Sequence, residues 1–240
     1  MHVLDLFSGI GAFSLGLERA GMTTVAFVEI DPYCRRVLAK HWPEVPQYDD
    51  VRSLTADRLR ADGISVDVIC GGFPCQDISL AGKGTGIGGE RSGLWSEFAR
   101  LIGEIRPRYV LVENVAALLD RGISDVLGDL AALGYDAEWS VVSACAVGFP
   151  HMRERVWIVA YPQSGRRQQR GWLQLTQGGD QARNIRERFD QPEPLRVADG
   201  RANRMDRLKG LGNSLVPQIP ELIGRAIMGQ TPTHNGQICG

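Results

Sequence analysis

The stretch VLDLFSGIGAF, residues 3–13, decides the fold, because an apolar run ends there in a glycine-rich turn and a helix-like pattern follows. A second apolar run, TVAFVEID, residues 24–31, has two acids near its end. Where strands alternate with helices, such turns line the ligand crevice, and an acid about 20 residues after the glycines can bind ribose hydroxyls. Because the turn is not GxGxxG, it favours a nucleoside ligand without a pyrophosphate. A purely structural turn after a buried strand explains the pattern equally well.

The first 160 residues continue this alternation of short apolar runs with amphipathic stretches. The pattern predicts an α/β fold with a doubly wound, mostly parallel sheet. The expected strands are residues 3–7, 24–28, 66–70, 109–112 and 156–160. The expected helices are residues 11–20, 31–40, 93–104 and 123–133, with Gly21 and Gly134 at helix ends.

Composition divides the chain into four parts. After residues 1–160, the segment 161–206 is rich in Gln, Arg, Gly and Asp and poor in apolar residues, which predicts a separate small irregular lobe. Apolar residues at helical spacing return within 207–228, and we expect this segment to pack back on the first domain. Residues 229–240 have the composition of a frayed tail.

Charge is unevenly distributed, although the formal net charge is only −1. Between residues 163 and 209 there are 11 Lys and Arg against 6 Asp and Glu, a net charge of +5. Such a stretch is either a soluble, loop-rich surface or a segment that contacts phosphates, and charge alone does not choose between them.

Cysteine spacing and hydropathy exclude other classes. The 5 cysteines form no CxxC pair and no Cys/His cluster of zinc spacing, so we expect free thiols and no metal site. No run of about 20 apolar residues could span a membrane, and the first residues lack the basic start of a signal peptide. We therefore expect a soluble, cytoplasmic protein.

The candidate nucleophile is Cys75, in the segment GGFPCQDIS, residues 71–79. This thiol follows a proline-fixed turn at the end of an apolar run, where it would be exposed to the crevice. Cys70, within the run, is expected to be a small core residue. An idle surface cysteine is the alternative for Cys75. Residues 80–93 contain six glycines, which indicates a mobile loop, either an active-site lid or a simple connector.

Three charged residues fall at other predicted strand ends. Glu113 follows the strand at 109–112, and Arg153 and Arg155 precede the strand at 156–160. Alternation along an extended chain places the two arginines on the same side. Each could be an ordinary salt-bridge former, but their convergence with Cys75 at one edge of the sheet favours a site.

Together these segments resemble the cytosine-5 DNA methyltransferase family. The matching segments, in the family's order, are residues 5–11 (DLFSGIG), 29–31 (EID), 72–76 (GFPCQ), 113–115 (ENV), 153–155 (RER) and 211–214 (LGNS). The resemblance covers roughly residues 1–160 and 207–228. It implies that 1–160 is the cofactor-binding and catalytic domain and that 161–206 is a short target-recognition lobe.

The resemblance implies a chemistry that needs these residue types. Carbon 5 of cytosine is a poor nucleophile, so the Cys75 sulfur would attack carbon 6 and make the ring enamine-like. Glu113, protonated, would donate to ring nitrogen 3, and a pKa raised by burial would help. Arg153 and Arg155 would orient the base and offset charge near its oxygen 2. The base must leave the helix for this attack, and residues 80–93 resemble the family's closing loop.

The family also implies the partners and their contacts. S-adenosyl-L-methionine would be the cofactor, and double-stranded DNA would be the substrate of a monomeric enzyme. A cognate restriction endonuclease would be its partner in a restriction-modification pair. The expected cofactor-binding residues are Phe7, Ser8, Gly9, Gly11, Glu29, Ile30, Asp50, Val51, Pro74, Leu94 and Asn213. The expected DNA-binding residues are Gln76, Ser79, Lys83, Arg91, Arg166, Arg167, Arg170, Arg183 and Arg186. Asp49 beside Asp50 leaves the register of that acid open.

Two departures from the family pattern matter. His151 and Met152 stand where the family has a Gln and a basic residue before Arg-Glu-Arg, which affects the surroundings of Arg153. The segment 161–206 is short for target recognition and has little apolar material to hold side chains rigidly in a groove. We therefore expect recognition that is short, loosely specific or dependent on ordering upon DNA binding.

Three other functions compete with this interpretation. An RNA cytosine-5 methyltransferase would share the architecture, but Cys75-Gln76 and the arginine-rich lobe resemble the DNA-acting members. An inactive DNA-binding relative would not need Cys75, Glu113 and both arginines intact. A nucleotide-dependent oxidoreductase leaves Pro74-Cys75-Gln76 without an explanation.

Overall fold

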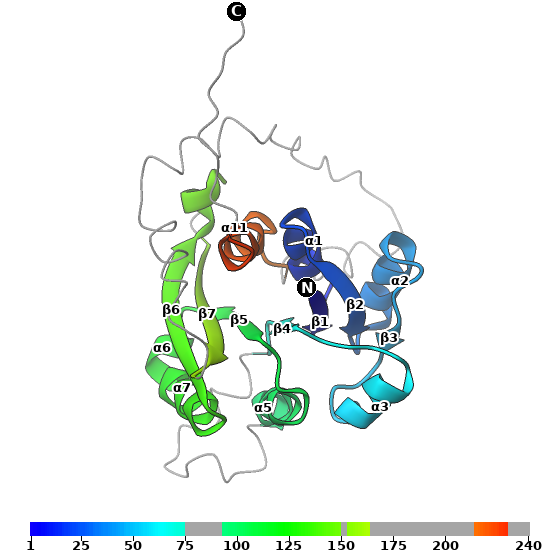
Figure 1. The fold of residues 1–240 in the computed structure, drawn as a ribbon. Helices are drawn as coiled ribbons and strands as arrows, with labels where there is room; N and C mark the ends of the chain where they lie inside the picture. The colour runs from blue at the N-terminus through cyan, green and yellow to red at the C-terminus, as the bar shows by residue number, and fades with distance from the viewer. Residues whose placement is uncertain (75–92, 150–152, 164–213, 230–240) are drawn as a thin grey trace, which may run out of the picture.

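A computed structural model describes residues 1–74, 93–149, 153–163 and 214–229. The described residues build a seven-stranded sheet in the order β3-β2-β1-β4-β5-β7-β6 (Figure 1). Its strands are β1 (His2–Leu6), β2 (Thr23–Val28), β3 (Gln47–Tyr48), β4 (Val68–Gly71), β5 (Tyr109–Val115), β6 (Tyr135–Ser143) and β7 (Glu154–Pro162). β1 to β5 pair in parallel, whereas β7 is antiparallel to both β5 and β6.

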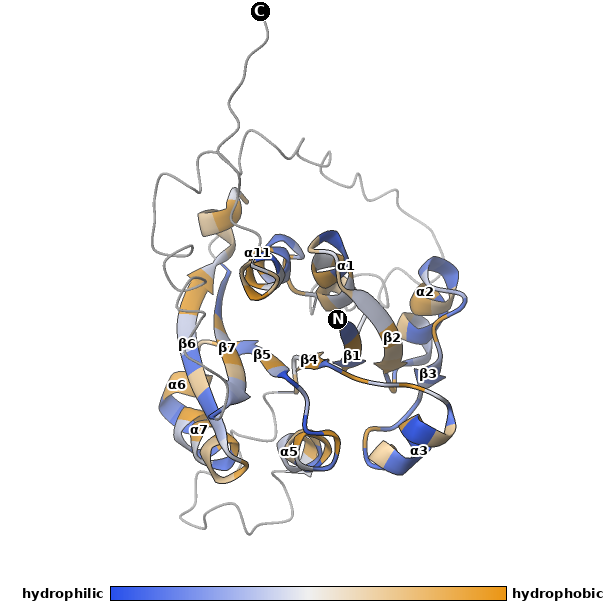
Figure 2. Ribbon diagram, viewed as in Figure 1, coloured by the Kyte–Doolittle hydropathy of each residue, from blue (hydrophilic) through white to orange (hydrophobic). Residues whose placement is uncertain are grey.

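Helices cover both faces of the sheet. One face carries α1 (Ala12–Arg19), α2 (Pro32–His41) and α11 (Gln218–Ile227), and the other carries α3 (Ala56–Ala61), α5 (Gly93–Ile105), α6 (Leu118–Arg121) and α7 (Ile123–Ala132) (Figure 1). A short 3-10 helix, η1 (Ala144–Val147), joins β6 to β7. Each face has its own apolar core, and Figure 2 shows helices with hydrophobic residues on one side and hydrophilic residues on the other.

Two glycines allow α11 to pack closely on α1. A Cβ on Gly224 would lie 2.7 Å from the Cβ of Ala20, and a Cβ on Gly16 would collide with the carbonyl oxygen of Pro217. Ile219, Ile223 and Ile227 of α11 belong to the same apolar core as α1. This helix therefore closes one face of the sheet. The division of the whole chain into four parts stays a prediction.

The predicted fold class is confirmed, with differences at particular elements. The expected strands and helices are present within a few residues, and Gly21 and Gly134 follow α1 and α7 with φ of 87° and 81°. The apolar runs and helical patterns did not predict β3, β6, α3 and α6. β5 also extends to Val115, so Glu113 lies within the strand and not after it.

None of the helices in the described part of the chain has the length and apolar character to cross a membrane.

Candidate active site at the carboxyl edge of the sheet

One edge of the sheet collects most of the described candidate residues. Leu6 of β1 lies beside Val28 of β2 and Gly71 of β4, so the turns after these parallel strands are neighbours. β7 runs the opposite way, and Arg155 near its start pairs with Val115 at the end of β5. The arginines therefore reach the edge from the beginning of their strand, and the other groups reach it from the ends of theirs.

The turn after β1 has an unusual backbone. Phe7 has a φ of 54°, in the left-handed region that a non-glycine residue rarely adopts, and Gly9 and Gly11 have φ of 54° and 88°. The buried Ser8 hydroxyl fixes the turn, because it donates to the Asp5 carbonyl at 2.6 Å and accepts from the Val28 N–H at 3.2 Å. Strain at a non-glycine residue that is held by its surroundings is characteristic of ligand sites.

Glu29 joins this turn to the end of β2. Its carboxylate accepts hydrogen bonds from the Gly9 N–H and the Asp31 N–H, both at 2.7 Å. Each carboxylate oxygen keeps further acceptor capacity, so Glu29 can also accept from two adjacent hydroxyls. Ile30 beside it is 66% exposed. Asp31 serves a different purpose, because its side chain accepts from the N–H groups of Tyr33 and Cys34 and caps α2.

The structure distinguishes Asp50 from Asp49. Asp50 is partly buried and accepts from the Arg52 guanidinium, with Nε 2.9 Å from Oδ1 and Nη2 2.6 Å from Oδ2. These hydrogen bonds lower the pKa of Asp50. Asp49 is exposed. Val51 is buried in the core against which Phe7 and Leu94 pack, so these expected cofactor residues share one apolar surface.

Glu113 and Arg155 form a partly buried ion pair. Nε of Arg155 lies 3.0 Å from Oε1 of Glu113, and the two side chains are 21% and 13% exposed. Burial raises the pKa of Glu113 to about 6, although Arg155 and Arg153 both lower it. Arg153 has a pKa lowered by burial and by Arg155, and its buried Nε has no hydrogen-bond partner among the described residues. The structure thus brings these three predicted residues together.

The segment before Cys75 is fixed against Glu113. A Cβ on Gly72 would lie 2.7 Å from Oε2 of Glu113, so any larger residue would force either this backbone or the carboxyl group to shift. The side-chain amide of Asn114 donates to the Phe73 carbonyl at 3.1 Å, and Asn114 is only 3% exposed. Asn114 is absent from the predicted site residues, although its place in the segment Glu113-Asn114-Val115 was a signal for it.

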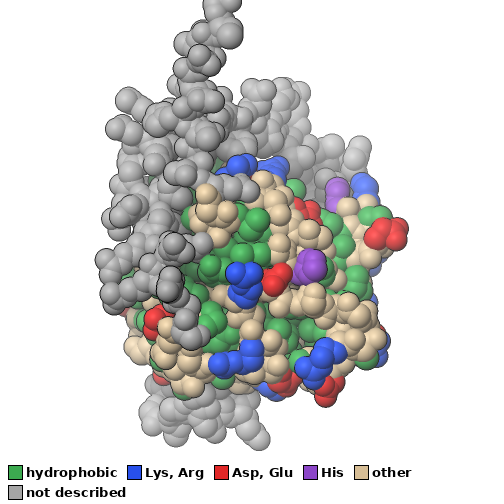
Figure 3. All heavy atoms as spheres, in the orientation of Figure 1, with side chains coloured by type: hydrophobic (Ala, Val, Ile, Leu, Met, Phe, Trp, Pro, Cys, Tyr) green, Lys and Arg blue, Asp and Glu red, His purple; other side chains and the backbone are tan. Residues whose placement is uncertain are grey.

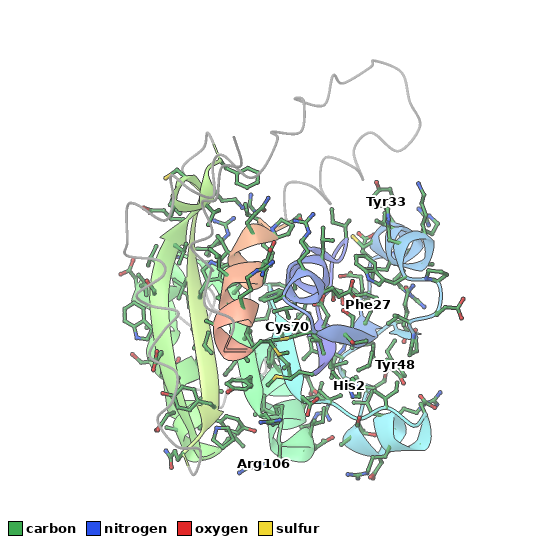
Figure 4. All side chains as sticks on the ribbon, turned by 45° about the horizontal axis from the view of Figure 1, so that its top comes forward. His2, Phe27, Tyr33, Tyr48, Cys70 and Arg106 are labelled. Carbon is green, nitrogen blue, oxygen red and sulfur yellow. The ribbon has the colours of Figure 1, made fainter. Side chains whose placement is uncertain are left out.

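A second acid lies below the turn of β1, in the interior. Asp5 is fully buried and accepts from the Ser14 hydroxyl at 2.7 Å. Burial raises its pKa to about 7, against the lowering effect of the bonds from Ser14. Its neighbour across the sheet is Cys70, whose thiol has a pKa raised by burial. Cys70 is fully buried in the core, as predicted, and Figure 4 shows it in the interior.

Several expected site residues lie outside the described residues. These are Cys75, Gln76, Ser79, Lys83, Arg91, Arg166, Arg167, Arg170, Arg183, Arg186 and Asn213, together with His151 and Met152. On the described surface in Figure 3, acidic and basic side chains are interspersed.

Comparison with known proteins now identifies the class. Residues 1–209 match the model of the C-5 cytosine-specific DNA methylase family. The chain belongs to this family of DNA methylases.

Particular relatives agree with this assignment. The chain is 40% identical over 168 residues to the type II methyltransferase M2.BsuMI of Bacillus subtilis, covering 67% of this chain and 42% of that protein. It is 40% identical over 164 residues to M.Eco47II of Escherichia coli, covering 66% and 39%. A crystal structure assigned as a prophage-encoded DNA modification methyltransferase superposes with a TM-score of 0.58 at 30% identity, over 68% of this chain and 47% of that one. The chain spans about half the length, or less, of these proteins.

Proposed function

We propose that this protein transfers a methyl group from S-adenosyl-L-methionine to carbon 5 of cytosine in double-stranded DNA. The observation that carries the proposal is the partly buried carboxyl group of Glu113, which lies between Arg155 and the Gly72–Pro74 segment that precedes Cys75 in the sequence. A carboxyl group with a raised pKa, paired with an arginine and packed against the segment that precedes a nucleophile in the sequence, suits proton donation to a heterocycle.

Cys75 and Glu113 divide the activation of the base between them. The Cys75 thiolate adds to carbon 6 of a cytosine that has left the helix, and a new carbon–sulfur bond forms. The electron pair of the ring double bond becomes available at carbon 5, while Glu113 gives its proton to nitrogen 3. With a pKa of about 6, Glu113 can be protonated near neutrality at little cost. Arg155 keeps the carboxyl group oriented, and Arg153, which lies close enough to lower the pKa of Glu113, would offset charge at oxygen 2 of the base.

Bound S-adenosyl-L-methionine supplies an electrophilic methyl group on a positively charged sulfur. Carbon 5 would take this methyl group as its bond to the sulfonium sulfur breaks, and neutral S-adenosylhomocysteine would be the leaving group. Water acting as a base would then carry the proton of carbon 5 to solvent, while the carbon–sulfur bond to Cys75 breaks and the sulfur leaves as a thiolate. Nitrogen 3 returns its proton to Glu113, so the protein is unchanged after one turnover.

The described residues fit the cofactor at its nucleoside end. Glu29 is a buried acid with spare acceptor capacity for two ribose hydroxyls, and exposed Ile30 offers an apolar surface to a purine ring. Asp50, held as a carboxylate by Arg52, would accept from the amino group of adenine. Phe7, Val51 and Leu94 supply the apolar side of the pocket. Ser8, Gly9, Gly11, Pro74 and Asn213 complete the proposed set.

We further propose that residues 161–206 recognise the target sequence and that the enzyme acts inside the cell as a monomer. We also propose a cognate restriction endonuclease as its partner: methylation by this protein would protect the DNA from cleavage by that endonuclease.

Methyl transfer to nucleic acids tests the proposal. Wild-type protein with radiolabelled cofactor should label duplex DNA, and digestion of that DNA should release 5-methylcytosine. Cys75→Ser should abolish labelling while thermal unfolding remains unchanged. Labelling of transfer RNA in place of duplex DNA would contradict the proposed substrate, and unchanged labelling by Cys75→Ser would contradict the proposed nucleophile.

A further inference from the structure

Arg100 of α5 connects two parts of the structure that lie far apart in the sequence. Its guanidinium reaches the segment between β3 and α3, where Nη2 donates to the carbonyl oxygens of Val51 at 3.1 Å and Leu54 at 2.9 Å. The side chain is 30% exposed, so these bonds form in a partly desolvated place. One guanidinium nitrogen therefore holds two carbonyl groups that are three residues apart.

Two acids of the same helix orient this guanidinium. Oε2 of Glu97 lies 2.7 Å from Nε of Arg100, and Oε1 of Glu104 lies 2.7 Å from Nη1. The other oxygen of Glu104 accepts from the Ala56 N–H at 3.0 Å, at the beginning of α3. The pKa of Glu104 is lowered, because these bonds from Ala56 and Arg100 outweigh the effect of burial. Both ends of the segment 51–56 are thereby bonded to α5.

The segment that Arg100 holds begins at Asp50. Asp50 and Arg52 form their ion pair there, and the Ser53 hydroxyl donates to the Asp50 carbonyl at 2.9 Å. These bonds fix the local shape of the turn but do not tie it to the rest of the molecule. In the described part of the chain, the polar bonds between this turn and α5 come from Arg100 and Glu104. Leu94, a proposed cofactor residue, lies at the start of the same helix.

We propose that Arg100 is a positioning residue for the cofactor, which holds the Asp50–Leu54 turn where Asp50 meets the adenine amino group. This inference rests on the proposed function. Without the guanidinium, two carbonyl groups lose their donor, and Glu97 and Glu104 lose the cation that both of them contact. The turn then relaxes away from α5, and Asp50 moves with it. Lysine is a poor substitute, because one ammonium group cannot reproduce the fork of donors.

Ligand binding with two bases separates this role from a general loss of stability. The ligands are S-adenosylhomocysteine and the analogue in which hypoxanthine replaces adenine, and the measurement is calorimetric Kd. Wild type should prefer adenine, because hypoxanthine has an acceptor where adenine donates to Asp50. Arg100→Gln should weaken adenine binding on the order of tenfold, which corresponds to about 1.4 kcal/mol. It should change hypoxanthine binding much less, so the preference for adenine should nearly disappear.

Arg106→Gln is the matched control. Arg106 follows α5 and also donates to a backbone carbonyl, that of Leu133 at 2.6 Å, but it lies at the periphery of the molecule (Figure 4). This variant should lose a comparable arginine–carbonyl bond and keep the full preference for adenine. Arg100→Lys should show an intermediate preference, and it serves as the test variant if Arg100→Gln does not fold.

The outcomes separate the two proposals. A wild-type protein that binds S-adenosylhomocysteine, with variants that retain its preference for adenine, would overturn the positioning role and leave the proposed function intact. A folded wild-type protein that binds neither ligand would overturn the cofactor proposal and this inference with it. Loss of the preference in Arg100→Gln or Arg100→Lys, but not in Arg106→Gln, is the supporting result.

Discussion

The two halves of the candidate site put acids to opposite uses. On the side of β2 and β3, hydrogen bonds from Arg52 lower the pKa of Asp50. On the side of β5, burial raises the pKa of Glu113 to about 6 even though two arginines oppose it. An ionised carboxylate accepts hydrogen bonds, whereas a protonated carboxyl group donates one. The contrast shows that one sheet edge favours the ionised form of one acid and the protonated form of another by changing only the surroundings of each acid.

The largest expected effect comes from removing the donor. Glu113→Gln keeps the size of the side chain but has no proton to transfer to nitrogen 3, so kcat should fall by about 10²- to 10⁴-fold. The Kd for S-adenosylhomocysteine should stay unchanged, because the residues proposed to bind its nucleoside lie on the other side of the site. Glu138→Gln on β6, whose carboxylate accepts from Tyr161, is the control and should retain full activity. A kcat of Glu113→Gln within threefold of wild type would contradict the claim that Glu113, unlike Asp50, acts as a proton donor.

Asp5 extends the comparison to stability. Its pKa is about 7 in the folded protein and 3.8 without burial, so the folded state binds more protons between these values. The stability that this proton binding adds to the folded state is fully present below pH ~4 and is lost as pH rises to ~7. The unfolding free energy changes by an amount on the order of 4 kcal/mol over this range. As pH rises over this range, the wild-type protein should therefore lose unfolding free energy relative to Asp5→Asn, whose side chain does not titrate. Urea unfolding at several pH values measures it, and parallel curves for the two proteins would contradict the raised pKa.

The close approach of the Gly72 backbone to Glu113 predicts a smaller effect. Gly72→Ala places a Cβ 2.7 Å from Oε2 of Glu113, so either the segment or the carboxyl group must shift. We expect a loss of about 1–3 kcal/mol in unfolding free energy, together with reduced methyl transfer. Gly128→Ala in α7 has no atom within 4 Å of the new Cβ, and should stabilise the protein by up to about 1 kcal/mol. Equal stability of the two variants would exclude the close approach as a constraint.

The smallest expected effect distinguishes the two neighbouring acids on the cofactor side. Asp50→Asn should weaken binding of S-adenosylhomocysteine about tenfold, because the amide offers a weaker acceptor and loses the ion pair with Arg52. Asp49→Asn, at the exposed neighbour, should leave the Kd unchanged. Calorimetric titration measures both, and the reverse order of effects would move the adenine contact to Asp49.

The sequence predicted the elements with strong local patterns. The apolar runs identified β1, β2, β4, β5 and β7, and glycines marked the ends of α1 and α7. β3 has too few residues for a pattern. β6 does alternate, from Tyr135 to Val141, but half of its residues are polar and Trp139 is 43% exposed, so a search for apolar runs overlooks it.

The sequence proposed the members of the candidate site, whose roles stay a prediction, but it did not predict the contacts among them. The order of the segments that resemble the methyltransferase family suggested Glu113, Arg153 and Arg155. Only the antiparallel direction of β7 explains why Arg155 contacts Glu113. Asn114, Gly72 and Arg100 act through contacts with residues 41, 41 and 46 to 49 positions away. Such pairings depend on the packing of distant segments, and no local spacing in the sequence encodes them.

Formation of a covalent complex on a blocked substrate tests the central claim most directly. Duplex DNA that contains 5-fluorocytosine cannot lose the substituent at carbon 5, so the sulfur of Cys75 should remain bound to carbon 6 after methyl transfer. Mass spectrometry of wild-type protein with this DNA and S-adenosyl-L-methionine should show one adduct on a peptide containing Cys75, and none with Cys75→Ser. A folded wild-type protein that methylates ordinary DNA but forms no adduct, or forms it at another residue, would contradict the account.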